Sequence, residues 1–419
     1  VNDDLPEPEG LESVWDNLPE LSPCLIDGIL RKGHKMLISG PSKAGKSFLQ
    51  IELCIAIAEG KKWLQWHCAQ GRVMYVNLEL DRASCLHRFK DVYEAMGFTP
   101  DNLQNIDIWN LRGKSVPMDK LAPKLIRRAA KKNYVAIIID PIYKVITGDE
   151  NSADQMANFC NQFDKVCTEL GCAVIYCHHH SKGNQGGKKS MDRASGARDP
   201  DALLDLIELE PTEALMKQEE NKAICKACMD YLDAHFKWED DLSQDDLLSS
   251  AQMMSYCEAH LDRWQKIALD KQITETKAAV QAHTAWRIEG TLREFPKFEP
   301  VNMWFEYPVH CLDQIGVLKD LELEADKPAW QKGREARKKQ GEQARKAKKE
   351  KYKMAIENFR FTHEDKYPTV KELYEVLKSD AEATGEKYPE EKTVRNSLKE
   401  IGFMVNKDTR CICPIPETF

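Results

Sequence analysis

The sequence predicts an α/β fold with a mostly parallel sheet flanked by helices. Short apolar runs alternate with longer amphipathic stretches from about Leu25 to Leu209. The runs are rich in β-branched residues and bounded by polar turns, which is typical of buried parallel strands joined by crossover helices. A glycine-rich phosphate-loop pattern directly follows the first run, which is the context such a loop requires. The expected strands are Met36–Ser39, Arg72–Leu78, Ile106–Trp109, Val135–Ile139, Ala173–Cys177 and Leu203–Leu209.

Length and composition bound the class of protein. At roughly 150 residues per domain, a chain of 419 residues has two or three domains. No apolar stretch approaches the roughly 18 residues that span a bilayer, which excludes a membrane transporter. The fourteen cysteines are scattered through apolar segments without a signal-peptide pattern, so a reducing, cytoplasmic setting is expected.

Charge is distributed unevenly along the chain. The formal net charge is -8, yet residues 331–353 carry eleven Lys or Arg against three Glu. This local charge of +8 leaves -16 on the rest of the chain. Any contact with nucleic acid is therefore expected to be local rather than spread over the whole surface.

Composition divides the chain into segments. Residues 1–22 are acidic and proline-rich and are interpreted as a lead-in, and the α/β core is expected over residues 23–323. Within the core, residues 211–283 have almost no strand signal and many helix formers, and Pro211–Ser250 holds ten acids against four bases. This pattern predicts an acidic helical insertion.

Strand character returns at Ala285–Phe295 and Met303–Tyr307, which are expected to extend the same sheet as an antiparallel hairpin. Residues 324–353 are interpreted as a basic connector, either helical or disordered. Residues 354–419 are expected to form a small separate domain with two helices, over residues 368–378 and 390–401, followed by a hairpin. Helix, helix, hairpin is the order of a winged helix.

The most specific motif is GPSKAGKS, a full GxxxxGK[ST] pattern between an expected strand and an expected helix. The glycines allow backbone N–H groups to face a phosphate, and the helix N-terminus adds positive potential. Lys46 is expected to reach the β and γ oxygens of ATP, and Ser47 to ligate Mg²⁺. The expected nucleotide-binding residues are Gly40, Pro41, Ser42, Lys43, Ala44, Gly45, Lys46, Ser47 and Phe48.

Two acids complete the expected site. Asp140 ends the run Val135–Ile139 and is the candidate second Mg²⁺ ligand on a neighbouring buried strand; the alternative is an ordinary strand-end acid. Hydrolysis also needs a carboxylate that orients water. Asp140 is followed by Pro141, so this base must come from elsewhere. Glu79 is the candidate, expected beside the strand that leads into the phosphate loop, with Asp81 as the fallback and a surface carboxylate as the alternative.

Three consecutive histidines, His178 to His180, follow a further strand. Adjacent residues of an extended segment point to opposite sides, so the three cannot chelate one ion. A polar sensor of the γ-phosphate is favoured, and ordinary loop residues are the alternative.

A catalytic arginine is expected in the segment that follows. Arg198 is the candidate for reaching across a subunit interface to a neighbouring nucleotide. Arg193 and Lys182 are rivals, and a salt bridge to Asp199 or Asp201 is the alternative role of Arg198.

The motifs GPSKAGKS, VNLELD, IIIDP, HHHSKG and DRASG, in this order, resemble those of RecA-like hexameric ATPases typified by the RepA-type replicative helicases of plasmids. The resemblance covers roughly residues 20–210 and 285–320. It implies a RecA core, a hexameric ring of identical subunits with ATP at the subunit interfaces, and single-stranded DNA in a central channel. The positions that match the family's functional residues are Lys46, Ser47, Glu79, Asp140, His179 and Arg198.

Two weaker patterns remain. Cys225-x-x-Cys228 and Cys257-x-x-His260 have zinc-like spacing, but both pairs fall in expected helices, where core packing is the better explanation. In the terminal domain, Lys392, Arg395, Asn396 and Lys399 share one face of an expected helix that could contact duplex DNA, with Lys407 and Arg410 on the wing. A solvated or protein-binding face is the alternative.

The sequence therefore favours a cytoplasmic, Mg²⁺-dependent ATPase with an oligomeric motor that acts on DNA, as a helicase or translocase of a mobile element. The second hypothesis is a DNA-binding initiator or helicase loader that uses ATP as a switch and does not separate strands. A sugar or nucleotide kinase is a distant third, because the late His, Lys and Arg motifs do not fit it.

Overall fold

The computed structural model describes residues 7–146, 153–179, 199–235, 237–238, 241–321, 329–363, 365–384, 390–406 and 409–415. The chain divides into two units, Val1–Asp326 and Lys327–Phe419, and each is considered by itself.

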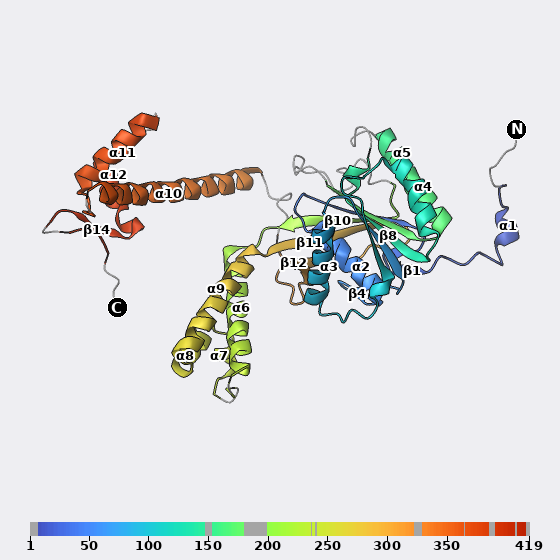
Figure 1. The fold of residues 1–419 in the computed structure, drawn as a ribbon, viewed down its shortest axis with the longest axis horizontal. Coiled ribbons are helices and arrows are strands. Elements are labelled where there is room, and N and C mark those ends of the chain that lie inside the picture. The colour runs from blue at the N-terminus through green and yellow to red at the C-terminus, as the bar shows by residue number, and fades with distance from the viewer. Residues whose placement is uncertain are drawn as a thin grey trace. The chain divides into compact units, whose positions relative to one another are not determined.

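In the described part of the first unit, one sheet has nine strands in the order β13-β12-β11-β10-β3-β9-β8-β6-β7. Figure 1 labels β12, β11, β10 and β8 among them. The strands from β10 to β7 are parallel, and β11, β12 and β13 add antiparallel pairs at one edge. The expected α/β fold with a mostly parallel sheet is confirmed. The parallel strands are β3 (Lys35–Gly40), β6 (Arg72–Asn77), β7 (Ile106–Asn110), β8 (Tyr134–Asp140), β9 (Ala173–His179) and β10 (Ala202–Leu209).

Helices cover both faces of the sheet, and alternate strand residues pack on them. On one face, α2 (Lys46–Glu59) and α3 (Arg82–Met96) share a core with Ile38, Tyr75 and Ile138. On the other, α4 (Met118–Ala129) and α5 (Ala153–Leu170) pack with Val76 and Ile139. Because side chains of a strand alternate between faces, strands buried on both sides are apolar throughout, as in the runs of the sequence.

The antiparallel edge is formed by β11 (Thr284–Leu292), β12 (Val301–Glu306) and β13 (Val309–Leu312). The expected extension of the sheet by a hairpin is confirmed, since β11 pairs with β10 and β12 with β11. The sequence does not predict β13, because its four residues follow Pro308 and are too few to show a clear alternation.

The helical insertion lies between β10 and β11 and consists of α6 (Glu213–Asp233), α7 (Gln244–Leu247), α8 (Ser250–His260) and α9 (Arg263–Ala282). Its own core contains Cys225, Cys228 and Cys257 with Leu232 and Trp238. The packing interpretation is confirmed for these three cysteines, whereas His260 is exposed and stacks on Tyr256 instead of entering the core.

The remaining elements of the first unit are short. They are α1 (Leu11–Val14), β1 (Cys24–Ile26), β2 (Leu30–Arg31), β4 (Lys62–Trp63), β5 (Trp66–His67) and the 3₁₀ turns η1 (Leu103–Asn105) and η2 (Ile142–Lys144). No helix in the described residues combines the length and apolarity needed to cross a bilayer.

The second unit is built on α10 (Ala329–Thr362), α11 (Val370–Thr384), α12 (Glu391–Ser397), η5 (Lys399–Ile401) and the hairpin β14 (Phe403–Val405) with β15 (Ile412–Pro414). From residue 329 on, the basic segment is thus helical, and α10 continues unbroken past residue 353. The C-terminal part of α10 enters the core through Tyr352 and Ile356, which pack with Leu373 and Val394. Gly402, with φ of 85°, ends the helical segment where the sequence indicates.

The close approach of Gly71 to Val135 generates a stability prediction. A Cβ on Gly71 would lie 2.5 Å from Cγ1 and 2.6 Å from Cγ2 of Val135, beside strand β8. We expect Gly71→Ala to lower the free energy of unfolding by about 1–3 kcal/mol through overpacking. Denaturant unfolding of Gly71→Ala, Val135→Ala and the double variant measures the coupling. If Gly71→Ala costs as much in the Val135→Ala background as in the wild type, this explanation is contradicted.

Candidate nucleotide site

The phosphate loop connects β3 to α2 through two residues in the left-handed conformation. Lys43 has φ of 67° and Gly45, the N-cap of α2, has φ of 72°. Left-handed residues in such a turn direct successive backbone N–H groups into a concavity that suits an anion. The helix N-terminus adds its partial positive charge at the same place. The loop is therefore shaped to hold a phosphate group.

Lys46, the first residue of α2, is buried, with 3% of its surface exposed. Its Nζ donates hydrogen bonds to the carbonyl oxygens of Gly40 at 2.8 Å and Pro41 at 2.7 Å. Burial lowers the pKa of Lys46 to about 8, although the neighbouring Asp140 acts in the opposite direction. With this pKa the amine is near its protonation midpoint at mildly alkaline pH. The neutral amine can still donate both of these hydrogen bonds.

Asp140 ends β8 and is buried, with 6% of its surface exposed. Its Oδ2 accepts a hydrogen bond from the Tyr75 hydroxyl at 2.6 Å, and its Oδ1 accepts one from the Cys177 thiol at 3.0 Å. Burial and the adjacent carboxylate raise the pKa of both Tyr75 and Cys177, so both groups remain protonated donors. Each carboxylate oxygen keeps a lone pair, and oxygen lone pairs are the ligands that Mg²⁺ prefers.

Strand order corrects one expectation about these acids. Neither the strand of Asp140 nor that of Glu79 lies beside β3, because β9 lies between β3 and β8, and β6 lies beyond β8. Chain order does not set sheet order in such a fold, since crossovers can skip a position. The strands are still in register at this end: Gly40 lies opposite His179, and Asn77 lies opposite Asp140.

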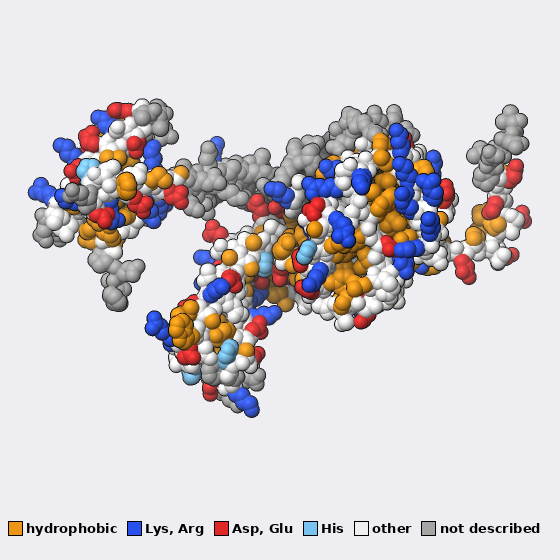
Figure 2. All heavy atoms as spheres, viewed as in Figure 1, with side chains coloured by type: hydrophobic (Ala, Val, Ile, Leu, Met, Phe, Trp, Pro, Cys, Tyr) orange, Lys and Arg blue, Asp and Glu red, His pale blue; other side chains and the backbone are white. Residues whose placement is uncertain are grey.

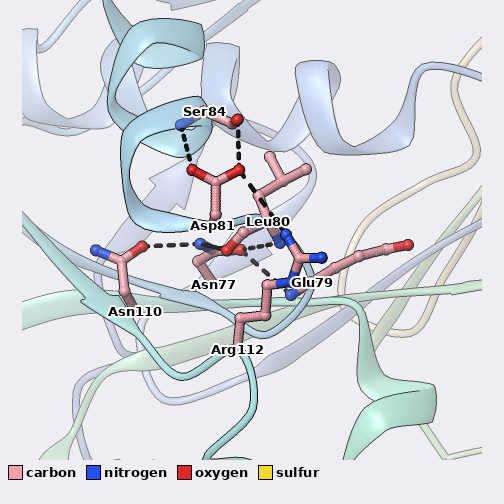
Figure 3. A network of polar contacts seen from close by, with 7 residues as sticks. All are labelled: Asn77, Glu79, Leu80, Asp81, Ser84, Asn110 and Arg112. Carbon is pink, nitrogen blue, oxygen red and sulfur yellow. Dashed lines mark hydrogen bonds and ion pairs between the residues drawn. The ribbon is translucent and has the colours of Figure 1, made fainter.

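A polar network fixes the turn after β6 (Figure 3). The buried Asn77 donates to Leu80 O at 2.7 Å and to Asn110 Oδ1 at 2.8 Å. Its Oδ1 accepts from the backbone N–H of Leu80 at 2.9 Å and of Glu79 at 3.3 Å. Because an amide that uses both donors and its acceptor cannot rotate without losing bonds, Asn77 holds Glu79 in a defined position.

The same turn separates the two candidate bases. Asp81 caps α3 by accepting from Ser84 N at 3.0 Å, and it lies 3.8 Å from Arg112. Its hydrogen bonds with Ser84 lower its pKa, which makes it a weaker base. Glu79 is exposed, and its side chain extends away from this network (Figure 3). Burial raises the pKa of Tyr143 and of Cys177, and the charge of Glu79 adds to both shifts. The Glu79 side chain therefore lies toward the ends of β8 and β9.

The remaining expected site residues are only partly described. Ser47 is half-buried in the first turn of α2, and Phe48 follows it. His179 is the last residue of β9, and its side chain lies outside the described residues. His180, Lys182, Arg193 and Arg198 also lie outside them, as does Lys407 of the expected wing.

Three residues of the site escape sequence-based prediction: Tyr75, Asn77 and Cys177. Each sits in an otherwise apolar strand, where a hydroxyl, amide or thiol is easily counted as packing. The available signal is their position, because all three lie in the last residues of parallel strands, the edge at which such sheets bind ligands.

The parallel sheet, the helices on both faces and the loop between β3 and α2 define a P-loop nucleotide-binding fold. Residues 9–185 match a family model described as an AAA domain. Among solved structures, the ATPase domain of G40P is 13% identical with a TM-score of 0.37, covering 67% of this chain and 85% of that one. A KaiC-like protein from the hyperthermophilic archaeon Pyrococcus horikoshii OT3 is 11% identical with a TM-score of 0.38, covering 69% of this chain and 93% of that one.

The lowered pKa of Lys46 generates a pH prediction. Between about 8 and the ordinary value of 10.5 the unfolded chain binds more protons than the folded one, so stability attributable to Lys46 rises with pH. We expect the free energy of unfolding of the wild type, minus that of Lys46→Met, to rise above pH 8 by up to about 1.4 kcal/mol per unit. Denaturant unfolding from pH 7 to 9.5 measures this, and a flat difference would contradict it.

Proposed function

We propose that this protein is a Mg²⁺-dependent ATPase whose oligomeric motor acts on DNA. The single observation that carries the proposal is the meeting of three features at one sheet edge. These are the anion-shaped loop, the buried Lys46 and the buried Asp140, whose charge acts on Lys46. A buried lysine and a buried aspartate beside an N–H concavity are costly in stability, which a structural role alone does not explain.

The residues present fit ATP with Mg²⁺. The loop N–H groups and the N-terminus of α2 hold the β-phosphate, and Lys46 exchanges its bonds to Gly40 O and Pro41 O for phosphate oxygens. Ser47 and Asp140 hold the metal, with Tyr75 and Cys177 orienting the carboxylate. The bound metal neutralises charge on the phosphate oxygens.

Glu79 is the proposed general base. It accepts a proton from the water that attacks the γ-phosphorus, and the bond to the ADP oxygen breaks. Asn77 fixes its backbone, and its exposed side chain is free of the capping role that occupies Asp81. His179, opposite Gly40 in the sheet, is the proposed sensor of the γ-phosphate.

The oligomer is part of the proposal. Arg198 is proposed to reach the nucleotide of a neighbouring subunit, where it stabilises charge on the transferring phosphoryl group. This role requires a head-to-tail contact between identical subunits, and a hexameric ring is the arrangement expected from the motif order.

A basic surface on α4 supports an action on DNA. Residues 112–132 contain eight Lys or Arg and one acid, in a chain whose net charge is negative. All eight bases are exposed, and basic side chains gather over α4 in Figure 2. Lys120, Lys124 and Arg127 recur at helical spacing on α4, away from the buried Leu121 and Leu125, so they form one stripe, and Lys131 follows in the turn after the helix. Such a stripe attracts a phosphate backbone.

The second unit supports the same partner. Lys392, Arg395, Asn396 and Lys399 are exposed, while Val394 and Leu398 of the same segment are buried. We propose that this unit is a winged helix, with α12 presented to duplex DNA and Arg410 of the hairpin contacting a phosphate.

An ATP-switched initiator or helicase loader is the second candidate. The acidic helical insertion and the separate second unit favour it, because both offer binding surfaces that a minimal motor does not need. The two candidates differ in turnover. Measuring the ATPase rate with and without single-stranded DNA, with oligomer mass in parallel, tests them. Hydrolysis stimulated by DNA supports the motor, and nucleotide-dependent assembly with negligible turnover supports the switch.

Substitution of the proposed base tests the chemistry. We expect Glu79→Gln to bind ATP as the wild type does but to hydrolyse it about 10²–10⁴-fold more slowly, the usual contribution of a general base. Asp81→Asn is the matched control, because asparagine also caps a helix. Lys46→Ala should lose both binding and turnover. Equal hydrolysis by Glu79→Gln and the wild type would remove Glu79 from the mechanism.

Charge reversal tests the basic stripe. We expect the triple variant Lys124→Glu, Arg127→Glu, Lys131→Glu to bind duplex or single-stranded DNA more weakly, with a salt slope smaller by roughly 3. The control is Lys61→Glu, Lys62→Glu, Lys297→Glu, which changes the net charge equally at other exposed positions. Fluorescence anisotropy over a range of salt concentrations measures both. Equal losses in the two variants would indicate net charge rather than a binding surface.

A further inference from the structure

A buried pair of ionisable side chains lies against the phosphate loop. His310, on β13, has a fully buried side chain, and its Nδ1 lies 2.7 Å from Oε1 of Glu52 on α2. The backbone N–H of His310 donates to the same Oε1 at 3.1 Å. Glu52 is 3% exposed and follows Lys46 by less than two helical turns. The pair therefore ties the antiparallel edge of the sheet to the helix that begins at the phosphate loop.

The other ring nitrogen of His310 is unsatisfied. Nε2 is buried and has no hydrogen-bond partner among the described residues. It faces Gly45, because a Cβ built on Gly45 would lie 3.0 Å from Nε2 and 3.1 Å from Cε1. A buried polar atom without a partner costs free energy, and it commonly marks a group that a ligand completes.

The surroundings fix the direction of this nitrogen. Oε1 of Glu52 already accepts the backbone N–H, so it acts as an acceptor toward Nδ1–H as well. The ring of Phe305 lies against the imidazole at a centroid separation of 4.6 Å and also approaches Gly45. With Nδ1 held by Glu52 and one face covered by Phe305, the imidazole keeps its Nε2 edge toward the loop.

We propose that His310 is a phosphate-binding residue of the nucleotide site, oriented by Glu52. Its Nε2–H donates a hydrogen bond to a phosphate oxygen of the nucleotide held at Gly45, and Glu52 orients the ring by accepting from Nδ1. This inference rests on the nucleotide site proposed above. It adds that the segment β12 to β13, far from the loop in sequence, completes the site.

The arrangement also explains why position 45 requires glycine. The positive φ alone disfavours other residues, and the imidazole occupies the space that a side chain would need. Binding the nucleotide therefore engages the edge hairpin together with α2, so the two elements respond to the ligand as one body.

Two substitutions at one position separate ligand binding from packing. His310→Phe keeps a ring of similar size but has no donor, and His310→Gln keeps an N–H donor on a flexible chain. Isothermal titration of the full-length chain with ATP and with ADP, each with Mg²⁺, measures the affinity. We expect His310→Phe to weaken the affinity for ATP and the affinity for ADP by about tenfold, the effect of losing a charge-assisted hydrogen bond. We expect His310→Gln to recover most of the lost affinity. The unfolding temperature of each variant reports its fold.

The outcomes are distinct. A His310→Phe variant that folds and binds ATP as tightly as the wild type overturns the inference, since the imidazole is then only packing. Loss of affinity in both variants with lowered unfolding temperatures also overturns it, because it shows a structural role. Wild-type protein that binds neither ATP nor ADP overturns the proposed function itself. A KM increase in His310→Phe with kcat within about twofold of the wild type supports binding over catalysis.

Discussion

Parallel pairing of β3, β9 and β8 is the constraint on which the site depends. Their register places Gly40 opposite His179 and Ile139 opposite Tyr176, so the loop, Cys177 and Asp140 reach one edge together. A shift of one residue in the register of any of these strand pairs would move each side chain to the other face of the sheet. The polar strand ends would then lie in the wrong layer, and apolar side chains would be poorly buried. The packing of both faces therefore fixes the position of the chemical groups as well as the fold.

Two buried charges meet at this edge, and local bonds make them tolerable. Asp140 receives two side-chain donors, and Lys46 is held by two carbonyl oxygens of its own loop. These hydrogen bonds replace the water that a charge loses on burial. The loss of water still costs free energy, so a buried ion pair rarely adds net stability. The arrangement is held ready for a more highly charged partner, which is typical of a site built to bind phosphate.

Much of this architecture could be predicted from the sequence, because the strongest local patterns coincide with the core. The run Val135–Ile139 predicts β8, and the loop motif fixes the start of α2. Strand order could not be predicted, so the expectation that Glu79 and Asp140 lie beside β3 is wrong, since β9 lies between. The partners of Asp140 and the contact of His310 with Gly45 depend on pairing across the sheet, and residues so far apart in sequence leave no local signal.

The attachment of the helical insertion has a consequence for the modularity of the chain. β10 and β11 pair over their whole length, and the last pair, Leu209 with Ala285, lies where the insertion leaves and returns. Opposed residues of antiparallel strands have Cα atoms about 4.5–5.5 Å apart, a gap that a two-residue turn closes. Helices α6 to α9 are thus attached through two adjacent strand ends, and Leu215 and Met216 of α6 pack against Trp304 of the sheet, so removing the helices would uncover this cluster.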